Sequence, residues 1–194
     1  MNLGQFILFG ALNLVRRTQL KIPHDPSEII ALVDKDDKVI GSATRREVHT
    51  KGLLHRETCV YILGTKKGLY LQKRADNGFW DHPVGGHFPK EQDYGEAAVR
   101  EIYEELGLKV KENELEELGK ENISNKEKTN NRFVKVFMLK KDIDQNELRL
   151  DAGEVAEVRL FSKRELEKLI NEEKGITGSA KKLIKKYFLE KMIE

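Results

Sequence analysis

The chain has 194 residues, which is long enough for one domain with a substantial core but cramped for two. Lysine and arginine number 35 against 33 aspartate and glutamate residues, and the charges are spread along the whole chain. We therefore expect no nucleic-acid partner, whereas a small anionic substrate remains compatible with this balance. The single cysteine, Cys59, excludes an internal disulfide and fits a reducing compartment, which predicts a cytoplasmic location.

An apolar stretch runs from Leu3 to Val15 and is followed by Arg16 and Arg17. It is shorter than the roughly 20 residues that cross a bilayer, so no stable membrane span is expected. A secretory signal would carry its positive charge ahead of the apolar stretch. We expect a helix packed on the domain or on a second subunit, which would make a homodimer; a membrane-surface anchor is the alternative.

Two prolines, Pro23 and Pro26, disfavour a helix just after this stretch and predict a linker. We therefore assign residues 1–27 to an N-terminal extension and residues 28–194 to the domain. Short apolar alternations bounded by polar turns predict strands in the first half of the domain. These strands are expected at residues 28–33, 39–44, 58–63 and 69–74.

A helix is predicted over residues 93–106, because its apolar side chains fall on one arc at about 100° per residue. They are Ala98, Val99, Ile102, Tyr103 and Leu106. Gly107 followed by Leu108 is a helix stop in which glycine takes the left-handed conformation. Further strands are expected at 132–139 and 154–161, and further helices at 162–171 and 178–194. A mixed sheet with helices against it belongs to the α+β or α/β class.

Three glutamates follow one another closely on this helix, directly after Arg100. Glu101, Glu104 and Glu105 fall within an arc of about 100°, opposite the apolar arc. Like charges four residues apart repel unless a cation binds them, and carboxylate oxygens suit Mg²⁺ or Mn²⁺. Arg100 is spaced to hold the carboxylates by charge-assisted hydrogen bonds. The alternative is an ordinary exposed acidic face, as we expect for Glu114, Glu116 and Glu117.

The spacing around this cluster resembles the signature of the Nudix hydrolases. That signature is a glycine, five residues, a glutamate, seven residues, and then Arg-Glu-U-x-Glu-Glu-x-Gly-U, with U a bulky aliphatic residue. The chain matches it from Gly86 to Leu108 at every fixed position except one, where Gln92 replaces the glutamate and Glu91 lies beside it. Gln92 can still accept a hydrogen bond from Arg100 but carries no charge.

The resemblance implies an α/β/α sandwich around a mixed sheet, and covers roughly residues 28–165. It implies that Glu101, Glu104 and Glu105, with the Gly86 carbonyl, hold Mg²⁺, with Mn²⁺ as an alternative, and that Arg100 belongs to the catalytic set. The expected reaction is hydrolysis of a diphosphate bond in a small molecule linked to a nucleoside diphosphate, or in a related substrate. A non-catalytic nucleotide-binding module is one alternative, because Gln92 departs from the signature.

A second alternative comes from segments that resemble the isopentenyl-diphosphate isomerase branch of this family. These segments are residues 47–56, 69–74, 80–81 and 84–87. In those isomerases, histidines that match His49, His55 and His87 help to bind a metal, and a cysteine transfers a proton to an alkene. This chain has Gly85 at the cysteine position, which argues against isomerisation. The histidines are expected to be either a second metal site or hydrogen-bonded structural residues.

Arg74 and the neighbouring Lys73 lie at the end of a predicted strand, where a guanidinium can grip a diphosphate in a bidentate manner. A solvated strand end is the alternative for Arg74. Glu154 and Glu157 resemble late acids of Nudix domains that bind metal or act as the base; they also fit the polar side of a strand. Substrate choice depends on segments outside the signature, including residues after Gly178.

Overall fold

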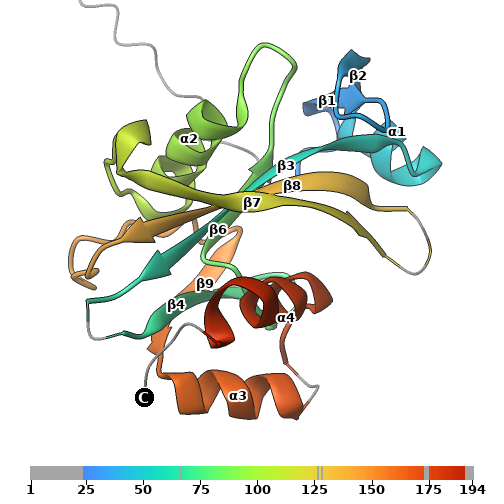
Figure 1. Ribbon diagram of the computed structural model, residues 1–194. Coiled ribbons are helices and arrows are strands. Elements are labelled where there is room, and N and C mark those ends of the chain that lie inside the picture. Colours follow the sequence, from blue (N-terminus) through green and yellow to red (C-terminus); the bar gives the residue numbers. More distant parts are fainter. Residues whose placement is uncertain (1–23, 66, 126, 128, 173–174, 191–194) are drawn as a thin grey trace, which may run out of the picture.

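A computed structural model describes residues 24–190 apart from residues 66, 126, 128 and 173–174 (Figure 1). The predicted N-terminal helix and the first half of the predicted linker, residues 21–23, lie outside the described residues, as do residues 191–194. No helix in the described part of the chain is long and apolar enough to cross a membrane.

The centre of the fold is strand β3 (Leu54–Leu63). Strand β8 (Asn131–Lys140) runs parallel to β3 along its whole length. The other edge of β3 pairs with three antiparallel strands in turn: β1 (Ile29–Val33), β6 (Val84–His87) and β4 (Leu69–Arg74). The outer strands are β2 (Val39–Thr44), β5 (Trp80–Asp81), β7 (Leu115–Ser124) and β9 (Val155–Phe161). The sheet is therefore mixed, as predicted.

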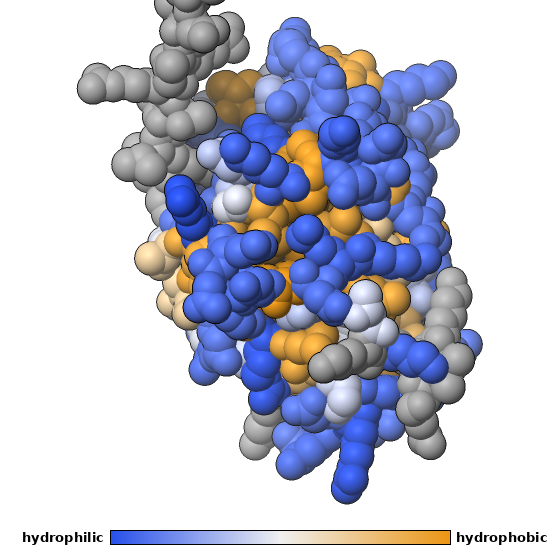
Figure 2. All heavy atoms as spheres, turned by 90° about the vertical axis from the view of Figure 1, so that its left-hand side faces the viewer, coloured by the Kyte–Doolittle hydropathy of each residue, from blue (hydrophilic) through white to orange (hydrophobic). Residues whose placement is uncertain are grey.

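Helices cover both faces of this sheet and form three layers (Figure 1). Successive residues of β3 point to opposite faces, so Val60 and Ile62 pack in one core beneath α2 (Tyr94–Leu106). Cys59 and Tyr61 pack in the other core with residues of α3 (Lys163–Asn171) and α4 (Gly178–Ile184). The predicted α/β/α arrangement is confirmed. The face shown in Figure 2 is mostly hydrophilic, with apolar side chains visible between the polar ones.

Helix α2 begins and ends where the sequence predicts. Asp93 caps it by accepting hydrogen bonds from the backbone N–H groups of Gly95 and Glu96, and the Glu96 side chain completes a capping box. At its end Gly107 has a φ of 73°, and Leu108 folds back into the core. The helix is therefore held at both ends, which fixes the direction of the side chains along it.

Helix α3 begins at the predicted cap, where the Ser162 side chain accepts a hydrogen bond from the Glu165 backbone and Glu165 completes the capping box. The predicted helix from 178 is α4, which continues into a π-helical turn, Lys185–Leu189. Both segments place apolar side chains on the sheet, including Leu166, Leu183 and Phe188.

Four elements were not expected from the sequence: helix α1, the short strands β5 and β6, and strand β7. Helix α1 (Arg45–Lys51) was not expected, because it is short and buries a single residue, Val48. Glu114, Glu116 and Glu117 do not lie on a helical face: Glu114 ends a 3₁₀ turn (Glu112–Glu114), and the other two lie on β7. On β7 they face solvent and pair with lysines of β8, and this exposed polar edge hides the strand in the sequence pattern.

Candidate active site

Gly86 on β6 and Glu101 on α2 meet in the centre of the candidate site. The Glu101 side chain is fully buried, and a Cβ added at Gly86 would lie 2.2 Å from its Oε1 atom. A glycine at this position is therefore what lets the carboxylate approach the backbone of β6. The Glu101 carboxylate and the Gly86 backbone are both oxygen donors of the kind that hard divalent cations take, so this cradle fits the predicted metal.

Arg100 ties the acidic residues of α2 to the end of β6. Its Nη1 atom donates to Glu104 at 2.7 Å, and its Nη2 atom lies 2.8 Å from Glu101 Oε1. The same Nη2 atom donates to the His87 carbonyl at 3.0 Å. Glu101 and Glu104 offset the burial of the guanidinium and raise the pKa of Arg100 above its ordinary value. Arg100 thus positions two carboxylates, as its spacing predicts.

Gln92 accepts a hydrogen bond from Arg100 Nε at 3.2 Å. The expectation that this amide keeps the contact without the charge is confirmed. It replaces an ion pair with a hydrogen bond from the Arg100 cation to an uncharged acceptor, so the attraction between two opposite charges is lost.

We expect Gln92→Glu to raise the affinity for a divalent cation about tenfold, because an ionised partner holds Arg100, and through it Glu101, more firmly. Titrating Mg²⁺ against the thermal unfolding temperature measures this effect. Gln145→Glu adds the same charge at an exposed position and should leave the affinity unchanged. An equal gain in both variants would assign the effect to net charge rather than to Arg100.

Glu105 is held separately from the other two carboxylates. Its Oε1 atom accepts from the Gly85 backbone N–H at 3.0 Å, and its Oε2 atom accepts from Gln72 Nε2 at 3.2 Å. Glu101 and Glu105 are both buried, whereas Tyr103 is 49% exposed. The predicted division of α2 into an apolar face and an opposite acidic face is therefore wrong in part, because the buried side of the helix includes these two glutamates.

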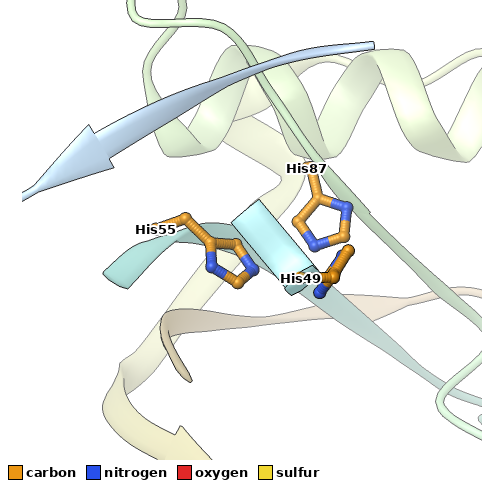
Figure 3. A group of neighbouring side chains, drawn as sticks. All are labelled: His49, His55 and His87. Carbon is orange, nitrogen blue, oxygen red and sulfur yellow. The ribbon is translucent and has the colours of Figure 1, made fainter. Parts of the chain in front are cut away.

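The three glutamates do not form a compact group of ligand atoms. Among the described residues, the group with ligand atoms within 4.8 Å of one another is His49, His55 and His87. Figure 3 shows the three rings turned toward one another, from α1, β3 and β6. Their ring centroids are 4.9 to 5.4 Å apart. The chain therefore brings the predicted histidines together, although 38 positions separate the first from the last.

The chemistry of these histidines fits a metal better than a hydrogen-bonded structural cluster. Both ring nitrogens of His87 and the Nε2 atom of His55 are buried without a hydrogen-bond partner among the described residues. Burial lowers the pKa of all three rings, that of His55 to about 4, so they are neutral at pH 7. Neutral imidazole is the form that binds Zn²⁺, Mn²⁺ and related ions.

A cavity of about 290 Å³ lies beside these groups. It is lined mainly by charged and polar side chains, and five of the predicted site residues border it: Arg74, Gly86, His87, His49 and Glu154. The predicted site residues that are not part of its lining are His55, Arg100, Glu101, Glu104, Glu105, Lys73 and Glu157. Lys73 lies near the Trp80 ring, and Glu157 is exposed on β9. Its volume lies at the lower end of the range for small-molecule sites, and its charged lining suits a charged ligand rather than an apolar one.

Arg74 forms part of the cavity wall and is held in place by two acids. It donates to Asp76 at 2.7 and 2.9 Å, and its Nη1 atom donates to Asp81 at 3.5 Å. These contacts raise the pKa of Arg74, so it stays cationic at any physiological pH. The predicted strand-end position is confirmed, and a solvated strand end does not describe it.

Several polar residues of the cavity were missed by sequence reasoning. They are Arg45, Glu57, Gln72, Asp81, His82 and Arg132. Glu57 and Arg132 form a buried ion pair beside His87, whose Nε2 atom lies 3.9 Å from Glu57 Oε2. A charged residue inside an apolar strand was the available signal, since such residues are rarely buried without a partner or a function.

Cys59 has the structural role that the sequence predicts. It is fully buried on β3, directly opposite Gly85 in the β3–β6 pairing. Burial raises the pKa of its thiol, so the thiolate is disfavoured at neutral pH.

Comparisons with family models, with known sequences and with solved structures all point to the same family. The family model of the NUDIX domain matches residues 53–185. An uncharacterized Nudix hydrolase of Pseudomonas aeruginosa is 33% identical over 140 residues, which cover 70% of this chain and 79% of that protein. The crystal structure of DR0079 from Deinococcus radiodurans superposes with a TM-score of 0.67 at 20% identity, covering 83% of this chain and 99% of that one.

A second group of relatives is more limited in extent. The isopentenyl-diphosphate Delta-isomerase of Pectobacterium atrosepticum is 37% identical over 89 residues, which cover 43% of this chain and 50% of that protein. The chain thus spans about half the length of the curated isomerases that it matches.

Proposed function

Because the chain belongs to the Nudix hydrolase family, we propose that it hydrolyses a diphosphate bond in a small molecule with the help of Mg²⁺ or Mn²⁺. Nudix hydrolases are generally metal-dependent enzymes that cleave pyrophosphate linkages. The proposed substrate class is a nucleoside diphosphate linked to another group, or a related diphosphate. The observation that carries this proposal is the close approach of the buried Glu101 carboxylate to Gly86. Arg100 holds this arrangement by contacting both the Glu101 carboxylate and the His87 carbonyl at the end of β6.

The residues of α2 would each serve this reaction in a different way. Glu101, with the Gly86 carbonyl, and then Glu104 and Glu105 would hold the cation, which when bound neutralises phosphate charge and lowers the pKa of a bound water. Arg100 keeps Glu101 and Glu104 in place, so their orientation is set before substrate arrives.

The cavity offers groups for the rest of the substrate. Arg74 can donate two parallel hydrogen bonds to phosphate oxygens from a cation that Asp76 and Asp81 already orient. Glu154 borders the same cavity and is half-buried, so between the two late acids we favour it over Glu157 as metal ligand or general base. Lys73 keeps at most an indirect role.

We also propose that His49, His55 and His87 form a second metal site. We expect His49→Ala and His87→Ala to lower the bound content of Mn²⁺ or Zn²⁺ by about one ion per chain, because each removes one of three ligands. Metal analysis after dialysis against the ion measures it. His24→Ala serves as the control, because His24 borders the cavity but lies outside the three. Unchanged metal content in both variants would leave the histidines a structural cluster.

Two other functions were weighed against hydrolysis. Isomerisation of isopentenyl diphosphate needs an acid at the position of Gly85, and the nearby Cys59 is a buried thiol. A binding module without catalysis is supported by the loss of charge at Gln92 alone, whereas the Arg100 contact to Gln92 is retained. The absence of an acid at Gly85 and the retained contact between Arg100 and Gln92 favour the hydrolase.

One experiment separates the three. The purified chain is incubated with Mg²⁺ and a panel of nucleotide sugars, dinucleotides, nucleoside triphosphates and isopentenyl diphosphate, and the products are identified. Cleavage of a diphosphate that EDTA abolishes is the expected result. Formation of the allylic isomer would favour the isomerase, and tight binding without products would favour the binding module.

The cytoplasmic location and the homodimer stay predictions. Size-exclusion chromatography with light scattering tests whether the chain forms a homodimer.

A further inference from the structure

His82 fills the place that a side chain at position 85 would occupy. A Cβ added to Gly85 would lie 2.4 Å from His82 Nε2 and 2.8 Å from its Cδ2 atom. Both residues line the 290 Å³ cavity, and His82 is 7% exposed. The imidazole therefore presents its Nε2 edge above the backbone of β6, at the point where the cavity meets Gly85 and Gly86.

Asp81 holds this ring from the opposite side. Its Oδ1 atom lies 2.9 Å from His82 Nδ1 and also accepts from the His82 backbone N–H at 2.9 Å and from Thr177 Oγ1 at 2.7 Å. Its Oδ2 atom accepts from Arg74 Nη1. The lone pairs of the carboxylate are thus directed to protein donors, and Asp81 orients His82 rather than facing the ligand itself.

The charge of the ring follows from these neighbours. Burial alone would lower the pKa of His82, but the adjacent Asp81 carboxylate raises it well above its usual value. The pKa of Asp81 is correspondingly lowered to about 2. The remaining titratable groups that face the ring are Cys59 and Tyr61 on β3, and the Cys59 thiol also makes a side-chain hydrogen bond with the imidazole. Burial raises the pKa of both groups, so they stay neutral. His82 is therefore an imidazolium at neutral pH.

We propose that His82 is a cationic substrate contact that donates a hydrogen bond from Nε2 to a phosphate oxygen of the ligand in this cavity. The inference rests on the proposed function for its substrate class. Asp81 contacts both His82 and Arg74. In this proposal the two cations therefore lie side by side and both face the diphosphate. A purely structural Asp81–His82 pair that anchors Thr177 is the competing explanation.

Binding of inorganic pyrophosphate in the presence of Mg²⁺, measured by calorimetry, tests the contact without requiring turnover. We expect His82→Gln to weaken binding about tenfold, since glutamine keeps a hydrogen-bonding side chain but not the charge. The matched control is Cys59→Ala, which alters a neighbour of the ring without removing charge and should bind as the wild type does. Above neutral pH, the wild-type affinity should fall toward that of His82→Gln as the imidazolium loses its proton.

Three outcomes would overturn the contact. Equal affinity of wild type and His82→Gln, or no pyrophosphate binding by the wild type, would leave the pair structural. If His82→Gln does not fold, the ¹⁵N resonance of His82 Nε2 in the wild type is followed instead, and an unchanged resonance on adding pyrophosphate refutes the contact. Binding that depends on His82 without cleavage of any compound in the panel would uphold the contact and refute the hydrolase.

Discussion

Glu101→Gln is expected to lower kcat/KM for the hydrolysed diphosphate about a thousandfold, the scale seen when one group that stabilises transition-state charge is removed. Glu101 is the fully buried carboxylate of α2, and Arg100 and Gly86 enclose it. The amide keeps the shape of the side chain but removes the negative charge that a divalent cation needs. Steady-state kinetics at saturating Mg²⁺ measures the effect, and Mg²⁺-dependent thermal stabilisation should be lost in parallel.

Glu91→Gln is the matched control for this change. Glu91 is an exposed glutamate next to Gln92, and it pairs at 4.0 Å with Lys90 rather than with Arg100. The variant should keep the wild-type rate. A loss of activity in Glu91→Gln would mean that Glu91 takes over the role of the missing glutamate, and full activity in Glu101→Gln would refute the metal role of α2.

Local signals explain what the sequence predicted correctly. The borders of α2 and α3 depend on caps that lie within a few residues of each end: Asp93, Gly107 and Ser162. The proximity of Gly86, Arg100 and Glu101 could be predicted from the sequence, because the signature spans only one strand, one loop and one helix. Such contacts are close in sequence, so their spacing nearly determines their geometry.

The parts that were missed depend on strand register. His55 lies opposite Arg132 in the β3–β8 pairing, and Glu57 lies opposite His87 in the β3–β6 pairing. No local pattern reveals that these four residues are neighbours, because 67 residues separate the end of β3 from the start of β8. A one-residue slip would turn each side chain to the other face, so only the assembled sheet identifies the buried polar cluster.

The burial of Glu101 and Glu105 was missed for a related reason. Helical periodicity assigns charged residues to the exposed side, but strand β6 lies against this part of α2 and accommodates both carboxylates. Gly85 donates to Glu105, and Gly86 has no side chain to keep Glu101 away. Departures from the binary pattern of apolar inside and polar outside are thus concentrated at the candidate site, where function requires buried charge.

Gly86→Ala is expected to disrupt the site through a single methyl group. The added Cβ would lie 2.2 Å from Glu101 Oε1 and 2.4 Å from its Cδ atom, so the carboxylate must move. Because Glu101 is buried and tied to Arg100, the strain should lower the free energy of unfolding by about 1 to 3 kcal/mol. The displaced carboxylate should lower kcat/KM about a hundredfold, since misplacement of about 1 Å has that effect.

Gly41→Ala separates this effect from the general cost of replacing a strand glycine. Gly41 lies on β2, its φ is not in the left-handed region, and a Cβ added there would meet no atom within 4 Å. Its substitution should change the free energy of unfolding by less than about 0.5 kcal/mol and leave the rate unchanged. Chemical denaturation and kinetics on both variants provide the comparison. If Gly86→Ala retains wild-type kinetics, the closeness of Glu101 to the β6 backbone has no catalytic role, and the observation that carries the hydrolase assignment fails with it.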